Sequence, residues 1–215
     1  MPRPLALIGP DRRGRRLAQL AAGLVLYGVT ASMMVLAGLG LDPWDVLHQG
    51  LSRTFGMGIG TWAVIISFVV LMLWIPLRQR PGFGTVANAA LVGSVIDLVL
   101  ALVHPPHALG PRIALLAGGV TGNGLATGLY IGAGLGPGPR DGLSVGLARR
   151  GHSMRVVRTS VEGTALLTGF LLGGTVGIGT LAYALAIGPI THVTIPALAI
   201  DRPVAQSRRV GFRRL

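Results

Sequence analysis

One segment of this sequence occurs twice. Residues 37–53, AGLGLDPWDVLHQGLSR, return as residues 133–149, AGLGPGPRDGLSVGLAR, with ten of seventeen positions identical at an offset of 96. A second pair extends the match, since six of the twelve positions in residues 82–93 are identical to those in 177–188 at an offset of 95. The chain of 215 residues is therefore an internal duplication, and its halves are expected to share one fold.

Composition indicates a membrane protein. Hydrophobic residues make up 51% of the chain and charged residues 12%, whereas a soluble domain carries about 25% charged residues. The net charge of +12 falls in short loops and tails between apolar runs, so lipid rather than nucleic acid is the expected partner. The absence of cysteine excludes disulfides, thiolate metal sites and a cysteine nucleophile. Neither a cofactor nor a metal site is expected.

Six apolar stretches approach the length of a membrane span, about 20 residues. The first is longer than the apolar core of a signal peptide, about 7–15 residues, so an uncleaved span is expected. Trp62 and Trp74 lie near the ends of the second, as in an interfacial aromatic belt. The spans are expected near residues 17–38, 60–77, 84–103, 113–134, from about 156, and 180–198.

Each copy of the duplication holds three spans, and an odd number inverts the second copy across the membrane. The expected fold class is an all-α polytopic membrane protein of six transmembrane helices in two inverted three-span repeats. The positions of arginine agree with this topology. It places 17 of the 19 arginines on the cytoplasmic side of the membrane and only Arg53 and Arg112 on the outer side. The expected parts are a basic cytoplasmic tail (1–16), repeat one (17–110), repeat two (111–200) and a second basic cytoplasmic tail (201–215).

In both motif copies a glycine-rich break precedes a proline and a short amphipathic helix, too short to span the membrane. Proline suits the first turn of a helix, so Asp42 or Gly138 would be the N-cap and Asp45 or Asp141 would lie near the third position. An acid there satisfies backbone N–H groups and complements the helix dipole. The motif residues are Gly38, Gly40, Pro43, Trp44, Gly134, Gly136, Pro139 and Arg140.

A functional alternative to capping is that these are broken or re-entrant helices, which follow the first span of each repeat. They would dip toward the membrane midplane from opposite faces and place Asp45 and Asp141 beside a pathway. A bare helix N-terminus attracts an anion, and an aspartate there offsets that preference. A cation, a proton or an amine-bearing solute is therefore favoured over a simple anion.

Other ionisable residues lie within predicted spans, where they are costly and often functional. Asp97 is in the third span, and its partner at the offset of 95 is His192. Arg158 and Glu162 are four residues apart on the fifth helix, so they share a face and can pair. That pair either lies at the cytoplasmic interface or lines a pathway.

Small residues recur every four positions in two places, and in lipid such faces let helices approach closely. We expect them to pack helices together, within the chain or against a second copy or another membrane protein. The two sets are Gly124, Gly128, Gly132 and Gly136, and Gly169, Gly173 and Gly177.

Residues 142–146, GLSVG, match the nucleophile elbow of serine hydrolases. That motif requires a strand, a turn, a helix and a catalytic triad, whereas Ser144 lies in a predicted helix and its repeat mate is His48. The protein is therefore not expected to be an enzyme, and an intramembrane hydrolase is a remote alternative.

Four segments together resemble the YczE/YyaS/YitT group of bacterial integral membrane proteins, most closely the YczE-like branch. They are GLGLDPWDVLHQGLS, GFGTVANAALVGSVID, RVVRTSVEG and GIGTLAYALAIGP, and the resemblance runs from about Leu17 to Pro196. Here Leu41 and Asp42 displace the family-like proline to Pro43, a local departure in the turn. The resemblance implies a multi-pass protein of the bacterial plasma (inner) membrane, often labelled as a transporter, and it implies no particular substrate.

We therefore expect a transporter or channel for a small solute or ion, with both termini cytoplasmic. The alternative is a membrane accessory protein that transports nothing and packs against another component through its glycine faces.

Overall fold

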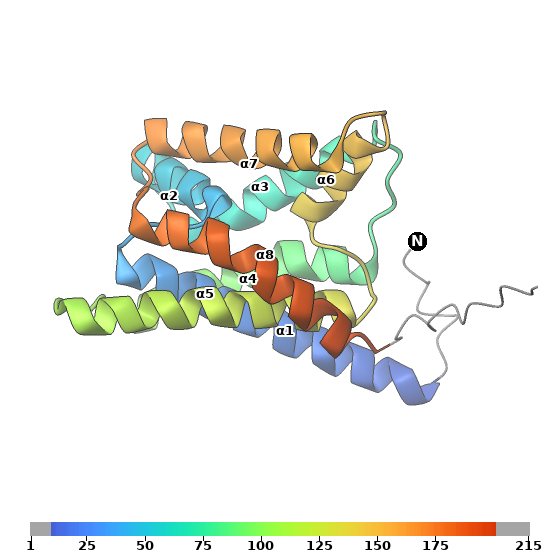
Figure 1. Cartoon of the computed structure of the whole chain (residues 1–215), viewed down its shortest axis with the longest axis horizontal. Helices are drawn as coiled ribbons and strands as arrows, with labels where there is room; N and C mark the ends of the chain where they lie inside the picture. Colours follow the sequence, from blue (N-terminus) through green and yellow to red (C-terminus); the bar gives the residue numbers. More distant parts are fainter. Residues whose placement is uncertain (1–9, 201–215) are drawn as a thin grey trace, which may run out of the picture.

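The structure, a computed structural model, describes residues 10–200, which form eight helices and no strand (Figure 1). The predicted all-α fold is confirmed for this part of the chain. Residues 1–9 and the predicted tail 201–215 lie outside the described residues. The helices are α1 (Pro10–Ala37), α2 (Pro43–Phe55), α3 (Ile59–Leu73), α4 (Phe83–Leu102), α5 (Leu109–Gly132), α6 (Pro139–Ala148), α7 (Met154–Leu171) and α8 (Ile178–Leu198).

The six predicted spans correspond to α1, α3, α4, α5, α7 and α8, and the two motif helices are α2 and α6. The main difference in bounds is at α1, which begins at Pro10 before the apolar run that starts at Leu17. Proline suits the first turn and arginine is a good helix former, so the helix continues through the basic segment. Residues 10–16, assigned from the sequence to the N-terminal tail, are therefore helical.

Three helices in the described range are long and apolar enough to cross a membrane: α1 over residues 12–37, α4 and α8. A fourth candidate is the pair α2 and α3, which bends by 113° at the break between its two helices. The helices α5 and α7 have 24 and 18 residues but are less apolar. Glycine recurs along α5, and α7 carries Arg155, Arg158 and Glu162.

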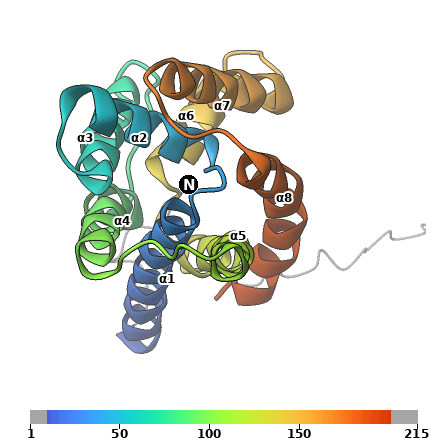
Figure 2. The same ribbon diagram turned by 90° about the vertical axis from the view of Figure 1, so that its left-hand side faces the viewer.

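The long helices α1 and α5 pack side by side, with α4 against α1 and α8 against α5. Seen nearly end-on in Figure 2, these four helices form one side of the molecule, and α3 and α7 lie on the other with α2 and α6 between them. The motif helices do not lie together at one end. Figure 1 shows α2 toward the left end of the molecule and α6 toward the right end.

Equivalent arginines join the ends of α1 and α5. Nε of Arg112 on α5 donates to the carbonyl of Ala37 at 2.7 Å, and Nη1 of Arg16 on α1 donates to the carbonyl of Ala133 at 2.8 Å. Both arginines and both alanines are related by the offset of 96. A cation at a helix C-terminus complements the helix dipole and the free carbonyls there.

The two Gly-Leu-Gly turns connect the halves of the chain. Each turn has two glycines with positive φ, a conformation that other residues adopt only with strain. In each turn the leucine accepts a hydrogen bond from the start of a helix in the other half. Leu39 accepts from N–H of Gly179 at 2.8 Å, and Leu135 accepts from N–H of Gly84 at 2.9 Å. The φ values are 60° at Gly38, 116° at Gly40, 69° at Gly134 and 130° at Gly136.

The glycine stripe of α5 packs against α8 within the same chain. A Cβ at Gly128 would lie 2.7 Å from Cβ of Thr194, and one at Gly132 would lie 2.5 Å from the carbonyl of Leu198. The expected close approach is therefore present. Gly136 is not part of the helical stripe as predicted from its spacing, because α5 ends at Gly132 and Gly136 lies in the following turn.

The prediction that Trp74 lies in an interfacial aromatic belt is wrong. Its side chain is only 2% exposed, and its indole N–H donates to the carbonyl of Pro139 at 3.1 Å. The tryptophan therefore joins the end of α3 to the start of α6, and it does not lie at a lipid interface. A buried indole needs an acceptor for its N–H, and the proline carbonyl supplies one.

Candidate functional site

A cavity of about 350 Å³ lies where the N-termini of α2 and α6 face each other. All eight helices contribute to its wall, including the long helices that carry most of the apolar surface. Its charged residues come from the two motif segments and from α7. Those residues are Asp42, Arg140, Asp141, Arg158 and Glu162, and the aromatic residues are Tyr27, Trp44, Tyr130 and Tyr183.

Asp42 is the N-cap of α2, as predicted. It has extended backbone geometry, and Oδ1 accepts from N–H of Trp44 at 3.0 Å and from N–H of Asp45 at 3.3 Å. Asp45 lies in the first turn and is 1% exposed. Its Oδ1 is 3.0 Å from Nδ1 of His48, one turn further along α2. Asp42 therefore caps the backbone, and Asp45 pairs with a buried histidine behind the cavity.

The start of α6 differs from that of α2. Its N-cap is Gly138, so no side chain caps the first turn. Oδ2 of Asp141 accepts from the hydroxyl of Tyr130 on α5 at 2.9 Å. A Cβ at residue 138 would lie 3.2 Å from that hydroxyl and 3.4 Å from Oδ2 of Asp141. A side chain at residue 138 would therefore crowd this carboxylate and its tyrosine partner, and glycine avoids that contact.

Arg140 links the two motif copies. It occupies the position that Trp44 holds in the first copy, and its guanidinium lies 5.1 Å from the centroid of the Trp44 ring. Nη1 is 3.5 Å from Oδ1 of Asp42, and Nη2 is 3.8 Å from Oδ1 of Asp45. One arginine from the second copy is thus shared by two acids of the first, an arrangement that no sequence spacing predicts.

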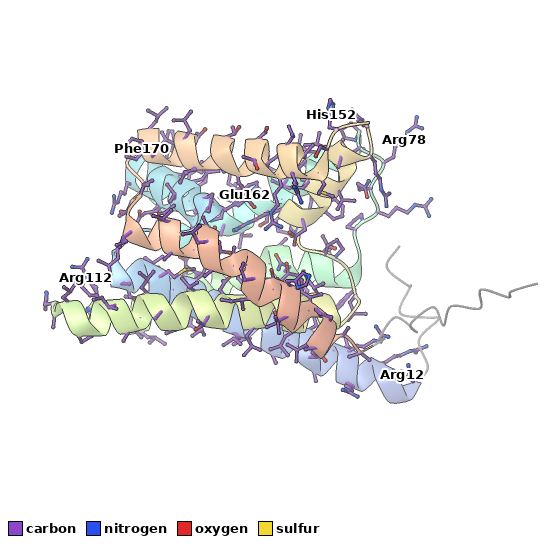
Figure 3. All side chains as sticks on the ribbon, viewed as in Figure 1. Arg12, Arg78, Arg112, His152, Glu162 and Phe170 are labelled. Atoms are coloured by element: carbon purple, nitrogen blue, oxygen red, sulfur yellow. The ribbon has the colours of Figure 1, made fainter. Side chains whose placement is uncertain are left out.

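Arg158 and Glu162 form the predicted pair on α7. Nε of Arg158 donates to Oε1 of Glu162 at 2.8 Å, and the two side chains are 58% and 38% exposed. Figure 3 shows Glu162 between the two ends of the helix bundle. Both residues also line the cavity, so the pair neutralises its own charge at the cavity wall. A role of this pair in a pathway remains a prediction.

Asp97 and His192 are not among the residues that line the cavity. Asp97 on α4 accepts from N–H of Gly60 at 2.7 Å and from the hydroxyl of Thr61 at 2.6 Å, both at the start of α3. The N-cap of α3, Gly58, offers no side-chain acceptor, so Asp97 supplies it from the neighbouring helix. His192 is exposed on α8.

Ser144 lines a second cavity of about 230 Å³ beside α6 and α7. Its hydroxyl lies 3.4 Å from the carbonyl of Arg140, one turn earlier in α6, while His48 pairs with Asp45. The serine thus lies within a helix and not on a strand-to-helix turn. Five residues line both cavities: Trp44, Arg140, Asp141, Arg158 and Glu162.

Several polar residues of the site were missed in the sequence. Tyr27, Asn88, Tyr130 and Tyr183 lie within apolar spans and line the cavity. The repeat offsets would have found three of them, because Tyr27 corresponds to Asn123 and Asn88 corresponds to Tyr183. The hydroxyl of Tyr183 is 3.2 Å from Oδ1 of Asn123, which is fully buried. Polar residues that recur at equivalent positions within apolar spans are therefore a usable signal.

Some buried polar atoms at the site have no hydrogen-bond partner among the described residues. They are Oδ2 of Asp42, Oδ2 of Asp45 and Nε2 of His48. Asp42 is 2% exposed and lines the cavity, whereas Asp45 and His48 lie behind it. A buried carboxylate oxygen without a donor is costly, so the α2 side of the cavity retains capacity to accept a hydrogen bond.

Comparison with known proteins supports a membrane location. A model of a family of unknown function (DUF6198) matches residues 14–196. The chain is 39% identical over 181 residues to an uncharacterized protein of Haemophilus influenzae, which covers 84% of this chain and 83% of that protein. It is 32% identical over 178 residues to the uncharacterized membrane protein YczE of Bacillus subtilis, with 81% and 83% covered.

The protein YyaS of Bacillus subtilis is 29% identical over 197 residues, which cover 88% of this chain and 96% of YyaS. No solved structure matches this chain. These relatives confirm the resemblance that the four sequence segments indicate. With three long apolar helices and a relative named as a membrane protein, the chain is a membrane protein.

Proposed function

The chain belongs to the DUF6198 family, and we propose that it is a transporter or channel for a small solute or ion. The observation that carries the proposal is the charged cavity where the N-termini of two short helices face each other. Discontinuous helices that end at a shared site near the midplane are typical of secondary transporters. Polar backbone at membrane depth is tolerated where it lines a cavity.

Two inverted three-span repeats account for the paired contacts. The arginines at the ends of α1 and α5 and the backbone hydrogen bonds of the two turns occur once in each direction between the halves. The motif helices lie toward opposite ends of the bundle (Figure 1). In this proposal α2 and α6 are re-entrant helices that enter the membrane from opposite faces.

Six spans are compatible with the lower apolarity of α5 and α7. The glycines of α5 lie against α1 and α8, where small residues allow close packing. The charged pair of α7 lines the cavity, so its charges are not all presented to lipid. Helices whose less apolar residues face protein or water need fewer apolar residues than an isolated span.

The ends of the molecule support the proposed orientation. Figure 3 shows Arg12, Arg78 and His152 toward one end and Arg112 and Phe170 toward the other. The end with Arg12 would face the cytoplasm of a bacterial plasma membrane, because loops rich in arginine stay on that side. Arg53 and Arg112, the two arginines assigned to the outer side, both donate to backbone carbonyls.

Single cysteines test whether the cavity is part of an aqueous pathway. The natural chain has no cysteine, so Ser67→Cys on α3 and Thr191→Cys on α8 would report from the cavity wall without background. Matched controls are Leu98→Cys on α4 and Leu185→Cys on α8, whose leucines are 59% and 68% exposed and are expected to face lipid. The assay is labelling by a charged, membrane-impermeant thiol reagent added to either side of sealed vesicles.

We expect labelling of the cavity cysteines and protection of the lipid-facing ones, because a charged reagent does not enter hydrocarbon. A transporter that alternates its access would show reactivity from both sides. If the cavity cysteines are as unreactive as the lipid-facing controls from either side, the pathway is refuted. That result would favour the accessory role.

A further inference from the structure

Carboxylates outnumber guanidinium groups around the cavity. Three acids and two arginines line it, and a fourth acid lies directly behind the α2 N-terminus. Such a site is short of positive charge, and a ligand that carries an anion would add to the imbalance. The four acids are Asp42, Asp45, Asp141 and Glu162, and the two arginines are Arg140 and Arg158.

The ion pairs of the cavity show which carboxylates already have a cationic partner. Glu162 is matched by Arg158 on its own helix, and Arg140 is shared between the two acids of the α2 segment. Asp141 has no ion pair within residues 10–200, and its hydrogen bond comes from the neutral hydroxyl of Tyr130. The α6 side of the cavity, beside Asp141, is therefore where a cation is best accommodated.

The cavity has more room than a bare ion fills, and part of its wall is apolar. At about 350 Å³, it is within the range of small-molecule sites, about 300–1,000 Å³. Part of its wall is aliphatic, from Val92, Ile131, Ile187 and Ile195. An inorganic cation would leave this surface against water, whereas a hydrocarbon body would cover it and gain the free energy of apolar burial.

Aromatic side chains lie in the same cavity as this carboxylate. Tyr27 and Tyr130 pack edge to face with ring centroids 6.0 Å apart and an interplanar angle of 74°, and both line the cavity. Aromatic faces attract organic ammonium groups. Gly138 places no side chain against Asp141, and both residues line the cavity, so a ligand in the cavity meets this carboxylate.

We propose that this cavity binds a small organic monoamine in its ammonium form, with the ammonium held by Asp141 and the hydrocarbon body against the aliphatic wall. The inference rests on the proposed function, because it names the class of solute that the pathway accepts. Arg140 offsets one of the two negative charges on the α2 side, and the ligand supplies a positive charge on the α6 side. Asp141 is thus the residue that distinguishes an amine from a neutral or anionic solute.

Thermal denaturation of the purified full chain in detergent tests this assignment. The probe is n-butylammonium chloride, and the matched solutes at equal ionic strength are n-pentanol, sodium butyrate and potassium chloride. We expect only butylammonium to raise Tm in a saturable way. Equal stabilisation by pentanol, butyrate or potassium ion would overturn the proposal in favour of apolar partition, an anion site or an inorganic cation site.

Two isosteric variants identify the carboxylate. Asp141→Asn is expected to weaken the apparent affinity for butylammonium by about ten- to hundredfold, as for removal of one charged hydrogen-bond partner. Asp97→Asn removes a carboxylate that lies outside the cavity wall and should leave the affinity unchanged. Equal losses in the two variants, or no loss in Asp141→Asn, would refute the role of Asp141.

A competition assay covers the case in which Asp141→Asn does not fold. Butylammonium should slow labelling of the Thr191→Cys variant, whose acids are all intact, while potassium chloride should not. If the cavity cysteines are labelled but butylammonium neither stabilises nor protects, the amine proposal fails and the pathway stands. If the cavity cysteines are unreactive from both sides, the proposed function itself fails.

Discussion

Replacing Gly136 with alanine should destabilise the contact between the two halves of the chain. Gly136 has φ 130°, and a Cβ there would lie 2.6 Å from Oγ1 of Thr85 and 3.1 Å from Cα of Gly82. Thr85 is fully buried. Its hydroxyl donates to the carbonyl of Pro137 at 2.8 Å and accepts from N–H of Gly82 at 3.2 Å, so it cannot rotate away without losing both bonds.

Two costs contribute to the expected effect. A residue other than glycine in this backbone region costs about 1–3 kcal/mol in strain, and overpacking a close contact costs about 1–3 kcal/mol more. Together they predict a loss of about 2–6 kcal/mol in the free energy of unfolding. The repeat mate, Gly40→Ala, should behave in the same way, because a Cβ there would lie 2.8 Å from Oγ1 of Thr180.

Two further glycines separate strain from packing. Gly151 has φ 97° with no atom within 4 Å of a new Cβ, so Gly151→Ala should show the strain alone, about 1–3 kcal/mol. Gly163 on α7 has neither a positive φ nor a close atom, so alanine there should stabilise the helix by about 0.5–1 kcal/mol.

Unfolding of the purified variants in mixed detergent micelles, followed by tryptophan fluorescence, measures these differences. Gly136→Ala should be the least stable of the three variants, Gly151→Ala intermediate and Gly163→Ala the most stable. If Gly136→Ala loses no more than Gly151→Ala, the packing of the turn on Thr85 contributes nothing. That result would refute the close packing of Gly136 against Thr85 and Gly82.

Further variants test the contacts that the arginines make. Arg140→Met removes the guanidinium that Asp42 and Asp45 share and should destabilise the protein by about 3–5 kcal/mol. Adding Asp42→Asn should recover part of this loss. Strictly additive effects in the double-mutant cycle would contradict an interaction between Arg140 and Asp42. Arg112→Ala and Arg16→Ala each remove a charged donor from a helix C-terminus and should cost about 1.5–3 kcal/mol. A measurable loss of stability in only one of these two variants would contradict their structural equivalence.

Much of the fold is predictable because its signals are local. Apolar runs, prolines at helix starts and glycines at breaks indicate where each helix begins and ends, and these features depend on a few neighbouring residues. The place of Asp42 before Pro43 predicts that it is the N-cap, and its side chain does accept from the first turn of α2. The duplication, in turn, relates Asp45 to Asp141 by sequence alone.

Side-chain partners across helices were not predictable in the same way. Asp97 lies in a predicted span like any pathway acid, yet its acceptor role depends on the start of α3 reaching it. Trp74 has the spacing of an interfacial residue, and it is buried because α6 crosses the end of α3. Spacing along one helix gives a face, but it does not say which element covers that face.

The sequence alone predicts the membrane class, the duplication, the helical elements and the two glycine turns, since apolar length and backbone conformation are properties of short segments. Helix packing, in contrast, places Arg140 of the second copy close to the two acids of the first. Packing likewise leaves Asp141 with a tyrosine hydroxyl and, within residues 10–200, without an ion pair. Ion pairing depends on distances of a few ångströms between residues almost a hundred positions apart, and helix packing sets those distances.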